Sequence, residues 1–298
     1  MRILVTGISG QVGRALLPRL RSHHVIAAGR ATLDLAKPER IAEALDRLAP
    51  ELIMNPAAYT AVDKAEDERD LANLVNAIAP AAMARWAAAR NVPFLHFSTD
   101  YVFDGSGEHP WREDDAPNPL SVYGASKLAG ENAVRASGGV CLIVRTSWVY
   151  AAEGVNFLRT IACFARERKE LRIVADQVGA PTSANLIAEI VAGMVTDGPD
   201  AFRVCCARAK GLVNLSAAGE TSWHGFATAI VDGLKARGMT LAIEQVHPIP
   251  SEAYPTRAKR PRNSRLDLSR LRQVFGVTPR PWRDALASEL NLLAKELR

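Results

Sequence analysis

The sequence is poor in cysteine, in aromatic residues and in long apolar runs. It holds only four cysteines, and none of them forms a C-x-x-C pair. This argues against a zinc site and favours a reducing compartment. No stretch reaches the roughly 18 consecutive apolar residues that a membrane span needs. The first residues lead directly into Thr6 and Gly7, without the apolar core of a signal peptide. We therefore expect a cytoplasmic protein that does not cross a membrane.

The charge balance is mild. The chain has 298 residues, with 37 lysines and arginines against 32 acidic residues, which gives a formal net charge of +5. Most cationic residues are scattered among acids, which is poor ground for nucleic-acid binding but suits an anionic small molecule. With 48% hydrophobic residues, a chain of this length suits one large α/β unit or two closely packed domains.

Short apolar segments alternate with helical patterns over the first half of the chain. This alternation predicts an α/β fold with a Rossmann-like, doubly wound parallel sheet covered by helices on both faces. The expected strands are residues 2–5, 25–28, 52–54, 92–97 and 140–145. The expected helices are residues 11–21, 41–48, 70–90 and 126–136.

Beyond about residue 150 this rhythm weakens. We therefore expect a dinucleotide-binding domain over residues 1–150 and a smaller, discontinuous α/β substrate-binding domain over residues 151–298. The sequence leaves open that segments of roughly 171–235 return to the first domain. Two irregular stretches, residues 103–121 and 248–264, are rich in proline and polar residues. A loop as long as the first is usually functional, often a lid.

Glycines recur at three-residue spacing directly after the first strand, at Gly7, Gly10 and Gly13. Such glycines let the backbone turn tightly and approach a pyrophosphate, and they present helix N–H groups to it. Turns collect glycine in any case, but a strand before the trio and a helix after it are the context of a dinucleotide site. The G-x-x-G-x-x-G spacing resembles that of the short-chain dehydrogenase/reductase superfamily.

Gly29 and Arg30 stand at the end of the second expected strand. An acid at this point would contact the ribose 2′-hydroxyl of NADH, whereas Arg30 suits the 2′-phosphate of NADPH. We therefore expect NADPH, with NADH as the alternative, and a surface role for Arg30 is about equally compatible with the sequence. Asp34 and Leu35 are the candidates for contacting the adenine.

Tyr123 and Lys127 lie four residues apart at the start of an expected helix, so their side chains share one face. A nearby ammonium favours the phenolate and lowers the pKa of a tyrosine, so this pair suits proton transfer to a carbonyl oxygen. Y-x-x-x-K alone is common. Here Ser98 and Thr99 also end a strand upstream, where ligands of parallel sheets bind. The conjunction predicts a hydride-transferring reductase with a catalytic hydroxyl at Ser98 or Thr99.

These motifs, with further segments through nearly the whole chain, resemble the dTDP-4-dehydrorhamnose reductase family of extended short-chain reductases. The matching segments are N-P-A-A-Y-T-A-V-D-K-A-E (55–66), S-T-D-Y-V-F-D-G (98–105), Y-G-A-S-K-L (123–128), R-T-S-W-V-Y (145–150), D-Q-V-G-A-P-T (176–182) and R-P-R-N-S-R-L (260–266).

The resemblance implies a role for each segment. For the cofactor it implies contacts from Gly10, Gln11, Val12, Ala58, Tyr59 and Thr60. For catalysis it implies Tyr123 as proton donor, Lys127 as its partner and Thr99 as the residue that tunes Tyr123. For the sugar it implies Thr99, Asp100 and Trp148. The cationic run that includes Arg262 and Arg265 is either a solvated loop or, as the resemblance favours, the site of the substrate diphosphate.

The sequence departs from the family at the positions of a metal site. Some members bind Mg²⁺ at a dimer interface through two acidic residues, and those positions correspond here to Ala15 and Asn185. Neither offers a carboxylate to a hard cation. We therefore expect no metal, and a monomer or weak homodimer.

The resemblance implies reduction of the C4 keto group of dTDP-4-dehydro-6-deoxy-L-mannose to dTDP-L-rhamnose. Two alternatives stay open at this stage. One is a reductase or epimerase of another nucleotide-activated deoxy sugar. The other is a non-catalytic regulatory subunit, because the β subunit of methionine adenosyltransferase resembles the same family.

Overall fold

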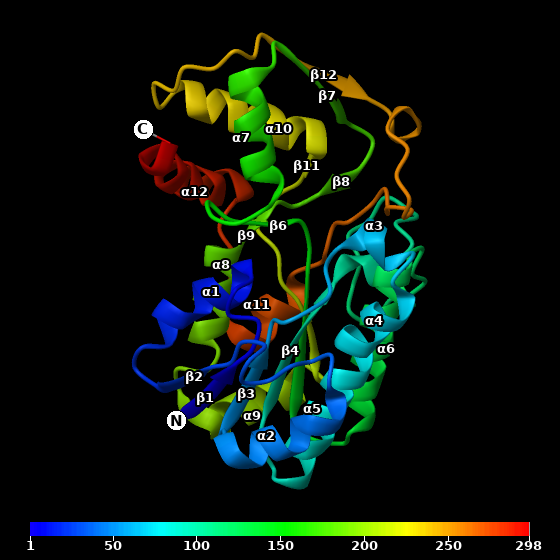
Figure 1. The fold of residues 1–298 in the computed structure, drawn as a ribbon, viewed down its shortest axis with the longest axis vertical. Coiled ribbons are helices and arrows are strands. Elements are labelled where there is room, and N and C mark those ends of the chain that lie inside the picture. Colours follow the sequence, from blue (N-terminus) through cyan, green and yellow to red (C-terminus); the bar gives the residue numbers. More distant parts are fainter. Residues whose placement is uncertain (298) are drawn as a thin grey trace.

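The computed structural model describes residues 1–297, and its centre is a parallel β-sheet (Figure 1). Within these residues the sheet has six strands in the order β10-β5-β4-β3-β1-β2. Each neighbouring pair is parallel, as predicted for this fold class. The strands are β1 (Arg2–Val5), β2 (His24–Ala27), β3 (Leu52–Asn55), β4 (Phe94–Thr99), β5 (Cys141–Thr146) and β10 (Leu212–Asn214).

Alternate side chains of the strands enter two different cores. Ile3, Leu95 and Val144 belong to one buried cluster, whereas Leu4 and Ile143 belong to the other. This alternation is what a sheet buried on both faces requires. The helices of this part are α1 (Gln11–Leu16), α2 (Ile41–Leu48), α3 (Val62–Ala65), α4 (Arg69–Asn73), α5 (Ala79–Ala89), α6 (Val122–Ala136), α8 (Ala184–Gly193), α9 (Gly198–Arg208) and α11 (Ser269–Phe275).

The chain passes from β1 to β2 on one side and then to β3 on the other side. In open α/β sheets, ligands bind outside the carboxyl ends of the strands at such a reversal. The segments that follow β1, β3 and β4 are therefore where a ligand is expected to bind.

A second group of elements lies beyond that edge, in the upper half of Figure 1. Its short strands form three two-stranded pairs, β12 with β7, β11 with β8, and β6 with β9. The elements are α7 (Phe157–Glu167), α10 (Trp223–Lys235), α12 (Trp282–Leu297), β6 (Val149–Tyr150), β7 (Glu170–Val174), β8 (Val178–Gly179), β9 (Thr182–Ser183), β11 (Thr221–Ser222) and β12 (Gln245–Ile249).

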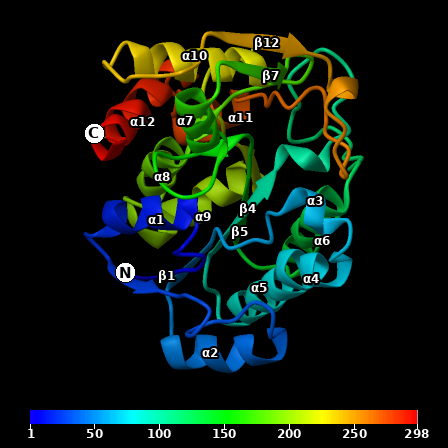
Figure 2. The same ribbon diagram turned by 45° about the horizontal axis from the view of Figure 1, so that its top comes forward.

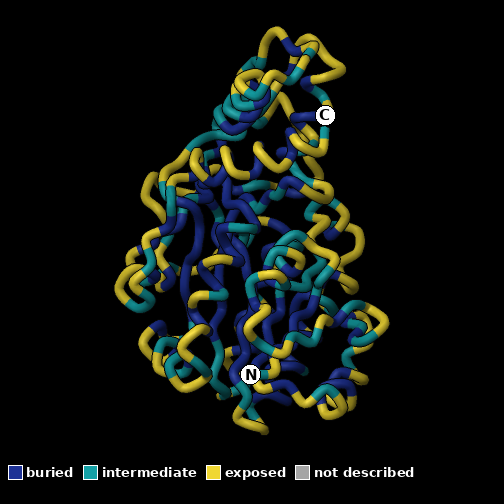
Figure 3. Tube along the Cα trace, turned by 90° about the vertical axis from the view of Figure 1, so that its left-hand side faces the viewer, coloured by how far each residue is buried: buried dark blue, intermediate teal, exposed yellow. Residues whose placement is uncertain are grey.

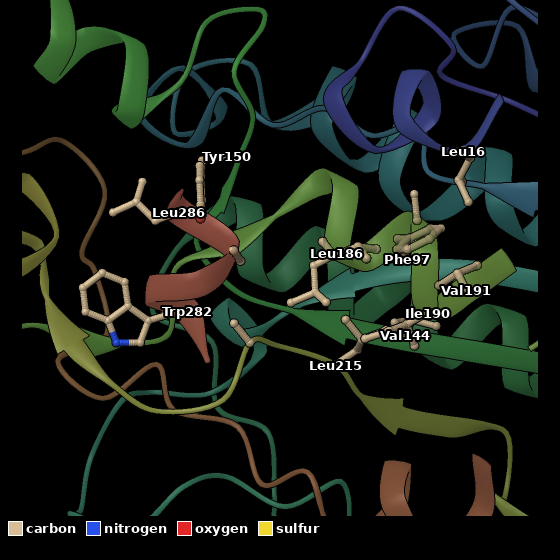
Figure 4. Close-up of a cluster of buried hydrophobic side chains, with 14 of the residues drawn as sticks. Leu16, Phe97, Val144, Tyr150, Leu186, Ile190, Val191, Leu215, Trp282 and Leu286 are labelled. Atoms are coloured by element: carbon tan, nitrogen blue, oxygen red, sulfur yellow. The ribbon is translucent and has the colours of Figure 1, made fainter. Parts of the chain in front are cut away.

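The two groups share one core and exchange chain segments. Strand β10 pairs with β5 in the large sheet, and α8 packs on α1, although both follow β6 in the sequence. Figure 4 shows side chains of the sheet, such as Phe97, in the same cluster as Trp282 of α12. Figure 2 shows α8 and α9 beside the sheet from a second direction. The upper elements are therefore seated on the sheet by apolar packing.

Three expected helices differ in their limits. The helix predicted over 11–21 is α only to Leu16 and continues as a 3₁₀ turn, Leu17–Leu20, because Pro18 cannot donate an i→i−4 bond. The helix predicted from residue 126 already begins at Val122, capped by the Ser121 hydroxyl, which accepts from Gly124 N at 3.2 Å. The helix predicted over 70–90 contains a π-helical turn at Leu74–Ile78 between α4 and α5.

Burial follows this architecture. The strands β3, β4 and β10 are buried throughout, and Figure 3 shows a buried interior surrounded by exposed segments. Within residues 1–297, no helix combines the length and the apolar character that a membrane crossing requires.

Candidate active site

The glycine-rich turn after β1 is shaped so that side chains would not fit. Gly7 has a φ of +57°, and a Cβ built there would lie 2.7 Å from Ala57 Cα. A Cβ on Gly13 would lie 2.3 Å from the carbonyl oxygen of Gly7. Gly10 is the N-cap of α1, and its N–H donates to Gly7 O at 2.9 Å. The turn thus brings bare backbone and the N-terminus of α1 to the edge of the sheet, as a pyrophosphate requires.

Polar atoms around this edge are buried without a hydrogen-bond partner among residues 1–297. They include Gln11 Oε1 beside the glycine turn and Ser98 Oγ at the end of β4. Thr146 Oγ1, at the end of β5, and Ser147 Oγ, directly after it, also lack a partner. Because buried polar groups in folded proteins are normally paired, such atoms mark where a polar ligand would supply the partner. With the glycine cradle, they fit a dinucleotide.

The predicted ribose and adenine contacts lie beyond β2. Ala27 pairs with Val5 in the sheet register, so Arg30 follows at the same edge as the glycine turn. Arg30 is exposed. The Asp34 carboxylate accepts from Ala36 N at 3.0 Å, and Leu35 is buried in the core cluster beneath.

The segment Ala58–Thr60 follows β3 and is held by a residue that the sequence analysis missed. Asn76 Oδ1 accepts from Tyr59 N at 2.8 Å, and its Nδ2 donates to Tyr59 O at 3.0 Å. The same amide donates to Ser126 Oγ of α6 at 3.0 Å. Asn76 lies in the π-helical turn, a feature that is frequent at functional sites but becomes visible only in the structure.

The Tyr59 side chain contacts Glu68. Its hydroxyl donates to Glu68 Oε2 at 2.7 Å, and this bond raises the pKa of Tyr59 to about 12. Thr60 is exposed, and Ala58 is half-buried.

Thr99 and Asp100 emerge at the carboxyl end of β4. The Thr99 hydroxyl donates to Asp100 Oδ1 at 3.0 Å and accepts from Tyr101 N at 3.2 Å. Asp100 is 2% exposed, and burial raises the pKa of its carboxyl group to about 6, although interactions with Ser264 and Thr99 lower it. Its Oδ2 has no partner among residues 1–297. A carboxylate oxygen is therefore available to a ligand hydroxyl.

Tyr123 approaches this strand end from the first turn of α6. Its ring meets the ring of Tyr101 edge-on, with centroids 5.6 Å apart. The approach is close because residue 124 is glycine: a Cβ there would lie 2.2 Å from Tyr101 O. The structure thus brings Tyr123, Thr99 and Asp100 together.

The expectation that Lys127 lowers the pKa of Tyr123 was wrong. Burial raises the pKa of Tyr123 to about 12, and the charge of Asp100 adds to this, while a hydrogen bond with Thr99 acts in the opposite direction. Lys127 is 2% exposed, and burial lowers the pKa of its own amine to about 8. Its Nζ donates to Phe97 O at 2.6 Å. The tyrosine therefore stays protonated at neutral pH.

Trp148 lies just after β5 with a φ of +48°. Its ring stacks on Trp223 of α10 with centroids 3.7 Å apart, and only 8% of the residue is exposed. A Cβ on Gly179 would lie 2.7 Å from this indole. Trp148 thus connects the end of the sheet with the upper elements.

The predicted cationic residues make ion pairs with other parts of the chain. Arg262 donates to Glu252 at 2.7 Å, and its side chain is 65% exposed. Arg265 reaches Glu220 at 3.2 Å. Arg260, which belongs to the same cationic run, binds the Asp63 carboxylate through two nitrogens at 3.1 and 2.6 Å. This pair ties the stretch 248–264 to α3.

The two positions that correspond to the metal ligands of some family members lie in α1 and α8. The Asn185 amide donates to Glu289 at 2.8 Å and accepts from Arg19 at 3.0 Å. Ala15 O accepts from the same arginine nitrogen at 3.0 Å. In the part of the chain that the structure describes, there is no group of three or more His, Cys, Asp or Glu residues suited to a metal ion.

Comparison with known proteins gives a consistent result over the full length. Residues 1–295 match the family model described as the RmlD substrate binding domain. A dTDP-4-dehydrorhamnose reductase of Burkholderia thailandensis is 45% identical, over 96% of this chain and 97% of its own. One from Shigella flexneri is 41% identical, over 98% of both chains.

Solved structures agree. A dTDP-4-dehydrorhamnose reductase of Clostridium acetobutylicum has a TM-score of 0.88 and 35% identity, over 98% of this chain and 99% of that one. The enzyme of Bacillus anthracis, solved in complex with NADP, has a TM-score of 0.86 and 30% identity, over the same shares. The chain belongs to the dTDP-4-dehydrorhamnose reductase family.

Proposed function

We propose that this protein reduces the C4 keto group of dTDP-4-dehydro-6-deoxy-L-mannose to dTDP-L-rhamnose, with NADPH as the reductant. The observation that carries the proposal is the meeting of Tyr123, Thr99 and Asp100 at the carboxyl end of β4, beside a glycine turn that admits a dinucleotide. Family membership supports the substrate class. It also favours a reductase over the regulatory subunit, because the relatives compared above carry reductase names.

Each residue at the strand end has a task in this proposal. Bound NADPH supplies a hydride to C4 of the sugar. Tyr123 donates its phenolic proton to the C4 oxygen, so that ketone, hydride and proton together give the alcohol. A phenol whose pKa is raised to about 12 is protonated at neutral pH, which suits a proton donor. Thr99 orients that phenol, and the free Asp100 oxygen accepts from a sugar hydroxyl.

On the cofactor side, we assign the pyrophosphate to the turn of Gly7, Gly10, Gln11, Val12 and Gly13, and the nicotinamide ribose to Lys127. The part of the cofactor between these two groups is assigned to Ala58, Tyr59, Thr60 and Ser98. Exposed Arg30 then pairs with the 2′-phosphate. In the Arg30→Ala variant, kcat/KM for NADPH should fall while that for NADH changes little. An unaltered ratio of the two would remove Arg30 from the cofactor site.

On the substrate side, we assign Trp148 to the deoxy sugar and Arg262 and Arg265 to the diphosphate. Arg262 is the more accessible of the two, because 65% of its side chain is exposed, against 20% for Arg265. A diphosphate competes well for such a guanidinium, since charge-assisted paired bonds to phosphate are strong.

One assay tests the proposed function directly. The protein is incubated with dTDP-4-dehydro-6-deoxy-L-mannose and NADPH, nicotinamide absorbance is followed, and the product is identified as dTDP-L-rhamnose by NMR. Turnover confined to a different nucleotide sugar, or an epimerised product, would contradict it. The proposal includes a cytoplasmic location and a monomeric or weakly dimeric state, which cell fractionation and light scattering would check.

A further inference from the structure

A series of buried polar side chains links the glycine turn to Lys127. The Thr6 hydroxyl donates to Asn55 Oδ1 at 2.6 Å, and Asn55 Nδ2 lies 3.0 Å from His96 Nδ1. His96 Nε2 lies 3.4 Å from Lys127 Nζ. Thr6 is 2% exposed, and Asn55 and His96 are fully buried. None of these contacts takes part in the reaction described above, apart from the one at Lys127.

The directions of these bonds determine the tautomer of His96. Thr6 Oγ1 accepts from Ala57 N at 3.3 Å, so its own proton goes to Asn55 Oδ1. Asn55 then presents its NH₂ group to His96 Nδ1, which must accept. A neutral imidazole that accepts at Nδ1 carries its proton at Nε2. The Nε2–H group therefore points at the Lys127 nitrogen.

The His96 ring and the Lys127 amine are both buried, and few charged groups face Lys127. His96 is held neutral because burial and the lysine charge bring its pKa well below the usual value, although the Asn55 backbone acts in the opposite direction. From α6 itself, Glu131 raises the pKa of Lys127, but that carboxylate is bound by Arg145 of β5 at 2.9 and 2.6 Å. At the strand end, Asp100, Tyr101 and Tyr123 are the further titratable groups.

We propose that His96 is a positioning residue for Lys127. Held as its neutral Nε2–H tautomer by Thr6 and Asn55, it directs an N–H group at the lysine nitrogen. That contact becomes a hydrogen bond only when Lys127 is the uncharged amine, so it favours loss of the proton. Lys127 is thereby set to exchange a proton near neutral pH, which serves to restore the Tyr123 phenol after each turnover. The catalytic part of this inference rests on the proposed function, whereas the tautomer does not.

The first test needs no activity. In protein labelled with ¹⁵N-histidine, the signals of the six histidines are compared with those of His96→Gln to assign His96. We expect one neutral species with Nε2 protonated, from about pH 6 to about pH 9. A protonated Nδ1, or conversion to imidazolium within this range, would overturn the proposal, even if the protein reduces no sugar at all.

The second test changes Thr6, which lies at the end of the series away from Lys127. Thr6→Val keeps the shape of the side chain but removes the proton that orients Asn55, whereas Thr6→Ser retains it and serves as the matched control. In Thr6→Val the amide can reverse, His96 Nε2 can then accept from the ammonium, and the alkaline limb of kcat/KM should move upward by about one pH unit. In Thr6→Ser the alkaline limb of kcat/KM should stay at its wild-type position.

A purely structural role for Thr6 would lower Tm in Thr6→Val without moving the limb, and that outcome contradicts the proposal. If no substrate is turned over, the same pair is compared by the ¹⁵N signals of His96. Thr6→Val should show protonation at Nδ1, and Thr6→Ser should match the wild type. Identical spectra in both variants would again overturn the inference.

Discussion

The two sides of the candidate site are built in different ways. On the side of the sheet, Lys127, His96 and Asp100 are buried. Lys127 donates to Phe97 O of β4, His96 contacts Asn55 of β3, and Asp100 accepts from the neighbouring Thr99 hydroxyl. On the side of the stretch 248–264, Arg262 and Arg257 are largely exposed, and they make ion pairs at the surface, Arg262 with Glu252 and Asp176 and Arg257 with Asp67. Buried polar networks are rigid, whereas exposed ion pairs contribute little and exchange easily.

This difference matches the two tasks of the proposed reaction. Proton donation requires a fixed position for the phenol relative to the reacting carbon, so the groups around it are locked. A diphosphate must displace whatever its arginines contact beforehand, so weak partners are an advantage there. If this is right, changes to the buried groups should alter turnover or stability, whereas changes to the exposed Arg262 should alter substrate binding alone.

The largest effect is expected at Tyr123. Tyr123→Phe removes the proton donor but keeps the ring against Tyr101, so turnover should fall by about 10²- to 10⁴-fold. Tm should hardly change, since only a hydroxyl is lost. Steady-state kinetics and thermal melts check both halves. Activity near the wild-type level would refute the role of Tyr123.

The next effect concerns the buried pair of Arg145 and Glu131, whose side chains are each 2% exposed. Arg145→Met leaves a buried carboxylate unpaired and should lower the free energy of unfolding by about 3–5 kcal/mol. The double variant Arg145→Met/Glu131→Leu should recover most of this loss, because no charge remains. Denaturant unfolding measures both. A double variant as unstable as the single one would show that the pair matters through shape alone.

A smaller, pH-dependent effect is expected at Asp100. Its folded pKa of about 6 exceeds the ordinary value of 3.8, so the folded protein holds the proton more tightly. Stability is therefore lost as pH rises from about 4 to about 6 and stays lost above that range. Asp100→Asn cannot ionise, so its Tm relative to wild type should be higher at pH 7.5 than at pH 4. A difference that is the same at both pH values would contradict this.

The smallest effect on stability is expected at the exposed side. Arg262→Ala should change the free energy of unfolding by less than about 1 kcal/mol, because its ion pair with Glu252 is exposed. KM for the nucleotide sugar should nevertheless rise, more at low salt than at high salt, with kcat little altered. Arg257→Ala, which removes an exposed pair with Asp67, serves as the control. Equal KM values in both variants would withdraw Arg262 from the diphosphate site.

The sequence was most informative where local chemistry decides the structure. The glycine turn, the apolar strands and the limits of α2 follow from steric demands and periodicity within a few residues. The spacing of Tyr123 and Lys127 similarly predicted a pair on one helix. The division of the chain at residue 150 stays a prediction, as do the assigned roles of the site residues.

What the sequence could not provide depends on partners distant along the chain. The pKa of Tyr123 was misjudged because burial raises it most, and the extent of burial is invisible in a four-residue spacing. Asn76 and His96 stand in ordinary apolar stretches, and only the fold brings them to Tyr59 and Lys127. Arg260 likewise finds Asp63 across nearly two hundred residues.

The π-helical turn at Leu74–Ile78 has a consequence for how this chain tolerates change. One helical register serves Tyr59 through Asn76, and another packs α5 against α2 and α6. Deleting a single residue from this turn would restore a regular helix and rotate one half against the other by roughly 100°. Such a deletion would break either the bonds between Asn76 and Tyr59 or the packing of α5 on α2 and α6. Insertions and deletions here should therefore be far more damaging than substitutions.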